Sequence, residues 1–92
     1  MSIENLFQRS TEMAKTLKNV SNDDLGILYG NYKQATLGDN TNDAPFFLQF
    51  EATAKWSAWM ACKGKSKEEA MKTYIIKTDE LFRRENSIAS HP

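Results

Sequence analysis

Two phenol rings and an ammonium group lie close together in one short segment, residues 28–39, whose sequence is LYGNYKQATLGD. If this segment is a helix, Tyr29, Tyr32 and Lys33 share one face, because residues three and four positions apart are neighbours on a helix. Flat aromatic surfaces beside a positive charge suit a ligand that contains a planar ring and a phosphate. The spacing alone is a weak indication, since a tyrosine at helical spacing is more often a core residue with an exposed hydroxyl.

Composition narrows the classes of function. A chain of 92 residues suits one small domain with a modest core. The 12 basic and 12 acidic residues cancel, which argues against a nucleic-acid partner. No signal peptide and no apolar run long enough for stable membrane insertion is expected. The single cysteine, Cys62, fits a reducing compartment. We therefore expect a cytoplasmic protein.

The sequence pattern predicts four helices that could position these side chains. It shows no alternation typical of a strand. Ser2 is expected to cap a first helix whose apolar stripe runs over residues 3–17. Ser21 or Asn22 is expected to cap a second helix, which ends at Gly38. Its inward face would contain Leu25, Leu28, Tyr29, Tyr32, Ala35 and Thr36. The sequence therefore predicts an all-α fold.

A loop over residues 38–49 separates these helices from two more. Its apolar residues are expected to anchor it on the bundle, together with the first residue of the next helix: Phe46, Phe47, Leu48 and Phe50. The third helix would cover residues 50–63, with Trp56 and Trp59 in the core. A capping box from Ser66 to Glu69 begins a fourth helix that extends to about residue 84. The domain is expected to cover residues 1–86, with a frayed tail over residues 87–92.

The link lengths leave two topologies open. Short links produce antiparallel neighbours, whereas the long middle link can cross the bundle and leave the second and third helices parallel. A parallel pair of this kind leaves an open groove more readily than a tight up-down bundle does.

Catalysis is poorly supported. The only histidine, His91, lies next to the C-terminus, and no metal-ligand spacing or phosphate-cradling glycine loop is present. Cys62 has no evident base partner, so it is better interpreted as a small buried thiol. The acidic pairs at residues 23–24 and 68–69 lie at predicted helix starts, where the helix dipole explains them. We expect a binding protein without catalytic residues, metal or cofactor.

Longer motifs carry a more specific resemblance. They are LYGNYKQATLGD, then Asn42 and Pro45, AKWSAW over residues 54–59, and KGKSKEEAMKTYI over residues 63–75. On these motifs the chain resembles the acyl-CoA-binding protein family, also called the diazepam-binding inhibitor family, over residues 7–80. The resemblance implies a four-helix bundle with up-down-down-up topology that binds medium- to long-chain acyl-CoA esters. It also implies a role in intracellular pooling and transport of these lipids in fatty acid metabolism.

Site residues follow from the resemblance by matching positions. The expected acyl-CoA contacts are Lys15, Tyr29, Gly30, Asn31, Tyr32, Lys33, Lys55 and Tyr74. In the family, the positions of Tyr29, Lys33 and Lys55 meet the 3′-phosphate of the adenosine. The position of Tyr32 packs on adenine, and that of Tyr74 also contacts the nucleotide. The acyl chain is expected in a groove lined near Leu25, Leu28 and the third helix.

The chain departs from the family pattern at several positions. Glu51 stands where many members carry a lysine that adds to the anion site, so that contact is expected to be absent. Gly26 replaces a common apolar side chain near the tail groove, and Phe46 and Phe47 are bulkier than the residue often found after Pro45. The link between the first two helices is one residue shorter than in typical vertebrate members.

Two other functions remain open at the level of the sequence. One is a helical protein-interaction module whose groove receives an amphipathic partner helix. The other is a general lipid carrier without CoA specificity. Neither function needs tyrosine and lysine side chains to converge on one point. For the acyl-CoA binder we expect a monomer whose partners are acyl-CoA esters and the enzymes that produce or consume them.

Overall fold

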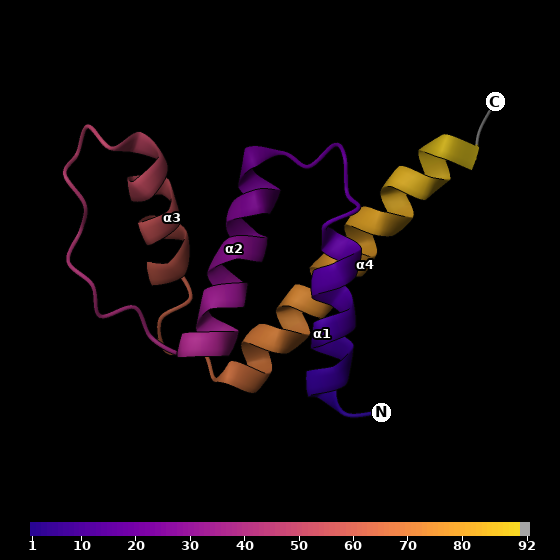
Figure 1. Ribbon diagram of the computed structural model, residues 1–92, viewed down its shortest axis with the longest axis horizontal. Coiled ribbons are helices and arrows are strands. Elements are labelled where there is room, and N and C mark those ends of the chain that lie inside the picture. Colours follow the sequence, from indigo (N-terminus) through magenta and orange to yellow (C-terminus); the bar gives the residue numbers. More distant parts are fainter. Residues whose placement is uncertain (91–92) are drawn as a thin grey trace.

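The computed structural model describes residues 1–90 and contains four helices: α1 (Ile3–Ala14), α2 (Asn22–Leu37), α3 (Phe50–Met60) and α4 (Lys67–Ser90). No strand occurs within these residues, so the predicted all-α class is confirmed. His91 lies outside the described residues. Figure 1 shows α1 running upward, α2 and α3 downward and α4 upward again. The topology is therefore up-down-down-up, with α2 and α3 parallel.

Local sequence signals place most helix ends. Three serines accept a hydrogen bond of 3.0–3.1 Å from the backbone N–H three residues later: Ser2, Ser21 and Ser66. The choice between Ser21 and Asn22 is thereby settled in favour of Ser21. Gly38 ends α2 with φ of 83°, and Gly64 follows α3 with φ of 91°, values that favour glycine.

Three helix ends differ from the sequence prediction. The first helix ends at Ala14 and the third at Met60, each three residues earlier than expected, and both continue into a tighter turn. In contrast, α4 continues to Ser90, past the expected end near residue 84. The predicted domain boundary at residue 86 thus falls within α4, and the division into domain and tail stays a prediction.

The helices pack in three close pairs: α2 with α4, α1 with α4, and α2 with α3. In Figure 1, α4 runs diagonally across α1 and α2 while α3 lies on the far side of α2. The buried apolar core lies where α1, α2 and α4 meet, and consists of Phe7, Leu28, Ala35, Ala70, Tyr74 and Leu81. Helix α2 is consequently the central element, with a neighbour on either side.

The predicted inward face of α2 is only partly right. Leu28 and Ala35 are buried, but Leu25 is 50% exposed and Thr36 is also exposed. Polar Asn31 and Gln34 are buried instead. The reason is that α2 contacts both α3 and α4, so its buried positions spread around the helix rather than forming one stripe.

The interhelix loop over residues 38–49 is held differently from the prediction. Its apolar residues and the first residue of α3 do not anchor it, since they are 56–74% exposed: Phe46, Phe47, Leu48 and Phe50. The indole N–H groups of α3 bind the loop instead. Trp56 Nε1 donates to the Asn42 carbonyl at 2.9 Å, and Trp59 Nε1 donates to the Gly38 carbonyl at 2.8 Å. Trp59 is buried, as predicted, whereas Trp56 is half-buried.

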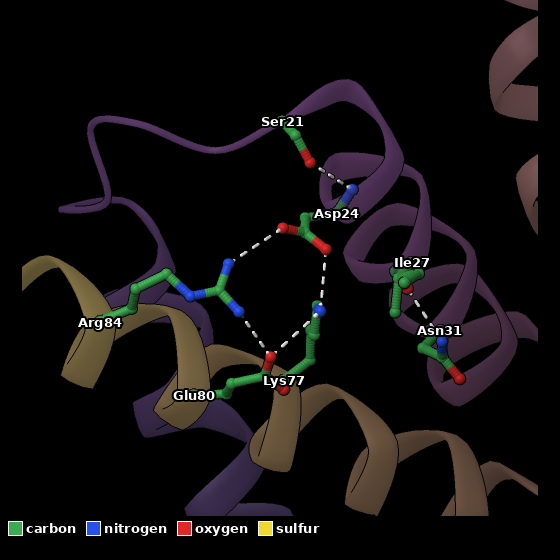
Figure 2. Close-up of polar contacts among 7 residues, drawn as sticks. All are labelled: Ser21, Asp24, Ile27, Asn31, Lys77, Glu80 and Arg84. Carbon is green, nitrogen blue, oxygen red and sulfur yellow. Dashed lines mark hydrogen bonds and ion pairs between the residues drawn. The ribbon is translucent and has the colours of Figure 1, made fainter.

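An ion-pair network joins the start of α2 to the middle of α4. Figure 2 shows Asp24 between two cations of α4, with Lys77 Nζ at 2.8 Å and Arg84 Nη1 at 3.9 Å from its carboxylate oxygens. Glu80 bridges the same two cations. The Asp24 and Lys77 side chains are each only 16% exposed. The hydrogen bond from Lys77 lowers the pKa of Asp24 below its ordinary value of 3.8, against an opposing effect of burial.

Acid is therefore expected to weaken this junction. Because the pKa of Asp24 is lower in the folded chain, its contribution is complete above pH 3.8 and is lost as pH falls through the folded pKa. Asp24→Asn is expected to lower the melting temperature at pH 7, and its difference from the wild type is expected to shrink as the pH falls below 3.8. Thermal melts over this range check the prediction. The control is Asp23→Asn, an exposed neighbour in the same helical turn; an equal loss for both variants would contradict the ion-pair account.

Candidate ligand-binding site

Two of the pockets that border α2 are lined by Tyr29. The first, which we call the α1–α2 groove, has a volume of about 410 Å³ and also reaches α4. It is lined by Thr11, Ala14, Lys15, Leu25, Leu28, Tyr29, Tyr32 and Tyr74. The second, the α2–α3 groove, has a volume of about 590 Å³. It is lined by Asn22, Leu25, Gly26, Tyr29, Phe50, Glu51, Ala54, Lys55 and Ala58. Leu25 and Tyr29 line both grooves and therefore stand between them.

A cluster of three aromatic rings, Phe7, Tyr32 and Tyr74, lies beside the α1–α2 groove, and the two tyrosines line it. Phe7 lies 5.9 Å from Tyr32 in a stacked arrangement and 5.2 Å from Tyr74 edge-to-face. Tyr32 is 42% exposed, so it offers part of a flat ring to a ligand, whereas Tyr74 is buried. Burial, with a smaller effect from Tyr32, raises the pKa of Tyr74. The Tyr74 hydroxyl therefore stays protonated at neutral pH and can donate a hydrogen bond.

Lys55 stands beside Tyr29 on the side of α3. Its ammonium nitrogen lies 5.7 Å from the Tyr29 ring centroid and 3.3 Å from Glu51 Oε1. Glu51 lies one turn before Lys55 and is itself exposed. A ligand anion at this point would have to compete with the Glu51 carboxylate for Lys55.

The other two predicted lysines lie on different sides of the molecule. Lys33 Nζ lies 4.9 Å from the centre of the Trp59 ring, so it extends toward α3 rather than toward Tyr32. Lys15, just after α1, lines the α1–α2 groove and pairs with Glu12 at 3.2 Å. The three lysines thus come from three elements: Lys15 from the end of α1, Lys33 from α2 and Lys55 from α3.

Gly30 and Asn31 line neither of these two grooves, although Asn31 lines a third pocket together with Cys62 and Lys65. A Cβ built on Gly30 would lie 2.2 Å from the Ala58 carbonyl oxygen, so this glycine allows α2 and α3 to approach each other. Asn31 donates to the Ile27 carbonyl at 2.8 Å, as Figure 2 shows, and accepts from Lys65 Nζ at 2.7 Å. Gly30 and Asn31 therefore have structural roles, in helix packing and in hydrogen bonding respectively. A contact of either residue with the ligand stays a prediction.

The sequence interpretation missed two residues near the site. Phe7 packs on Tyr32 and Tyr74, and the Trp59 ring makes a cation–π contact with the Lys33 ammonium. Each was recognised only as an apolar residue at helical spacing, and the sequence contains no signal for their cross-helix partners. Among the side chains described, no group of three or more His, Cys, Asp and Glu could hold a metal ion. None of the four helices has the length and apolar character needed to cross a membrane.

Comparison with known proteins places this arrangement in a family. The family model described as acyl CoA binding protein matches residues 4–78. The chain is 45% identical to acyl-CoA-binding domain-containing protein 1 of Oryza sativa over 98% of this chain and 100% of that protein. It is also 45% identical to the acyl-CoA-binding protein of Brassica napus, over 98% of this chain and 99% of the relative.

Solved structures agree with these sequence matches. The crystal structure of Oryza sativa acyl-CoA-binding protein 2 superposes with a TM-score of 0.89 at 44% identity, covering 91% of this chain and 92% of that one. The structure of the protein from Moniliophthora perniciosa gives 0.81 at 31% identity, covering 91% and 83%. The resemblance and the bundle topology that it implied are both confirmed, and the chain belongs to the acyl-CoA-binding protein family.

Proposed function

We propose that this protein binds medium- to long-chain acyl-CoA esters non-covalently and acts as a carrier without catalysis. The observation that carries the proposal is the position of Tyr29, which lines both grooves and has the Lys55 ammonium 5.7 Å from its ring. The Tyr29 ring thereby provides an aromatic surface next to a cation and to two partly apolar grooves. An ester that joins a nucleotide to a hydrocarbon needs these three features side by side.

The nucleotide end of the ligand would be held by rings and lysines. Tyr32 would pack on the adenine, and the Tyr74 hydroxyl, which is protonated at neutral pH, would donate to the head group. Lys33 and Lys55, with the Tyr29 hydroxyl, would bind the 3′-phosphate, and Lys15 would add a charge from α1. Each charge-assisted bond contributes on the order of 1.5–3 kcal/mol. Since CoA carries about three to four negative charges, these lysines would offset most of its charge.

The acyl chain would lie in the α2–α3 groove. Leu25 is half exposed at its edge, and the side chains of Ala54, Ala58 and Phe50 line it without charge. Leu25 also reaches the α1–α2 groove, where Leu28 lies, so the chain can pass from the head-group site into the channel. Burying a methylene contributes about 0.8 kcal/mol. The tail would therefore set affinity and the head group would set identity.

The cellular role proposed is pooling and transport of acyl-CoA in the cytoplasm by a monomer. Acyl-CoA esters are the direct partners, and enzymes that produce or consume them are the indirect ones. Membership of a family of binding proteins supports this role. No cofactor or metal is needed for it.

Titration with bare CoA and with palmitate tests the proposal. Bare CoA is expected to bind with low but measurable affinity in calorimetry, because the head-group contacts exist without the tail. Palmitate is expected to bind poorly, because it lacks the nucleotide. A protein-interaction module would bind neither, and a general lipid carrier would bind palmitate as tightly as palmitoyl-CoA. Either of these two results would overturn the proposal.

Lys33→Ala is expected to weaken binding of every CoA ester by a similar factor. The predicted loss is roughly tenfold to a hundredfold, the equivalent of one charge-assisted bond. The loss should not depend on tail length, because Lys33 contacts only the head group in this proposal. Calorimetry with octanoyl-, lauroyl- and palmitoyl-CoA measures it. The control is Lys72→Ala, an exposed lysine on α4 paired with Glu68; a loss that grows with tail length would contradict the proposed position of the ligand.

A further inference from the structure

The segment that leads into α3 exposes an unusual amount of apolar surface. Four large side chains in five residues are 56–74% exposed, and we call them the aromatic turn: Phe46, Phe47, Leu48 and Phe50. The rings of Phe46 and Phe47 pack on each other, with centroids 4.9 Å apart. Contiguous exposed apolar surface of this kind marks a contact with another surface more often than single exposed residues do.

Backbone geometry shows that this exposure is built into the chain. The Gln49 N–H donates to the Phe46 carbonyl at 2.8 Å and closes a turn. Phe47 and Leu48 therefore occupy its two central positions, where glycine, proline, asparagine and aspartate normally predominate. Residues at the corner of a turn point away from the fold, so packing within the domain does not account for these two side chains.

The shape and charge of the region favour a lipid surface over a protein groove. The loop and α3 form one outer edge of the molecule in Figure 1, and α3 packs on α2. A projecting turn presents no concave surface to receive a partner's side chains, whereas the boundary of headgroups and acyl chains accepts a single projecting apolar element. From residue 39 to residue 55 the charged residues are Asp39, Asp43, Glu51 and Lys55. This acidic balance does not attract an anionic surface.

We propose that the aromatic turn docks this protein peripherally on an uncharged phospholipid surface, with Phe47 and Leu48 inserted at the interface. Phe50, the last residue of the aromatic turn, lines the α2–α3 groove. Docking would therefore bring one end of that groove to the membrane, where hydrocarbon chains are located. The docking itself needs no acyl-CoA and does not depend on the function proposed above.

Flotation with phosphatidylcholine vesicles, in the absence of acyl-CoA, tests the proposal. The wild type is expected to float with the vesicles. The double variant Phe47→Ser, Leu48→Ser is expected to lose about tenfold or more in vesicle partitioning, since it removes the two apolar side chains that would be buried in the lipid interface. Matched controls are Leu37→Ser on α2 and Ile76→Ser on α4, residues 61% and 67% exposed outside the turn. These controls should partition within about twofold of the wild type.

Several outcomes would overturn the proposal. They are failure of the wild type to float, equal flotation of the double variant, and binding that requires phosphatidylserine. Sedimentation equilibrium adds another: a dimer of the wild type that the double variant abolishes would make a second copy the occupant. Circular dichroism and lauroyl-CoA affinity serve as controls for folding, because neither Phe47 nor Leu48 lines a groove. Loss of acyl-CoA binding in every protein, with flotation retained, would refute only the proposed function.

Discussion

Replacing Gly30 with alanine is expected to displace α3 and to abolish tight acyl-CoA binding. A Cβ at this position would lie 2.2 Å from the Ala58 carbonyl oxygen, 2.8 Å from its carbonyl carbon and 3.2 Å from Cys62 Sγ. The first two atoms belong to the backbone of α3, so no side-chain rotation can make room. We expect a loss of about 3 kcal/mol or more in the free energy of unfolding. The α2–α3 groove, which depends on the spacing of these helices, should lose its shape.

Gly26 provides a matched control one turn earlier on α2. A Cβ there would meet only the Ala58 Cβ at 3.9 Å, which is ordinary contact. Gly26→Ala is expected to stabilise the protein by about 0.5–1 kcal/mol, because alanine favours a helix interior over glycine. Chemical denaturation of both variants measures the difference. Equal stability of Gly30→Ala and Gly26→Ala would show that α3 can move away from α2 without cost.

The starts of α1, α2 and α4 and the end of α2 were predictable because their signals are local. The hydroxyl oxygens of Ser2, Ser21 and Ser66 each accept a hydrogen bond from the backbone N–H three residues later. The positive φ of Gly38 and of Gly64 is a property of the glycine residue itself. Neither interaction needs a partner from elsewhere in the chain. The family resemblance supplied the topology, which link lengths alone left open.

Burial on α2 was less predictable, because it depends on neighbours that are distant in sequence. Leu25 was expected to face inward and is half exposed, whereas Gln34 is buried. The Gln34 side chain donates to Asp39 Oδ1 and to the Lys65 carbonyl, and the second of these partners lies 31 residues away. These two hydrogen bonds satisfy the amide nitrogen and offset part of the cost of burial, although Gln34 Oε1 has no hydrogen-bond partner among the described residues. The sequence pattern cannot show such partners.

The candidate site shows the same division. Tyr29 and Tyr32 line one groove together, as their helical spacing predicted. Lys33 shares their face in the spacing argument but lies over Trp59 on the side of α3. The difference arises because α2 stands between two grooves, and a long flexible side chain at the border can reach either side. Spacing predicts the position of a residue on a helix, but the neighbouring helix decides where a lysine ammonium lies.

The largest effect on binding is expected from the length of the acyl chain. Palmitoyl-CoA should bind on the order of a thousandfold more tightly than acetyl-CoA, at constant salt. The fourteen additional methylenes of palmitoyl-CoA give on the order of 10 kcal/mol in gross transfer free energy, from which the cost of ordering the chain must be subtracted. The α2–α3 groove, at about 590 Å³, is where the chain would be sheltered. Calorimetry with acetyl-, octanoyl-, lauroyl- and palmitoyl-CoA measures the dependence.

The form of this dependence distinguishes a groove from non-specific adsorption. Affinity should rise with each methylene while the groove still has room and should level off once the chain extends beyond it. Ala54→Trp would place a large side chain in the α2–α3 groove, from an exposed residue that lines it, and should flatten the slope while leaving bare CoA binding nearly unchanged. The head-group variant Lys33→Ala should do the reverse, lowering every affinity without altering the slope. An affinity that is the same from acetyl- to palmitoyl-CoA would mean that the hydrocarbon remains in water, and the groove between α2 and α3 would then have no part in binding.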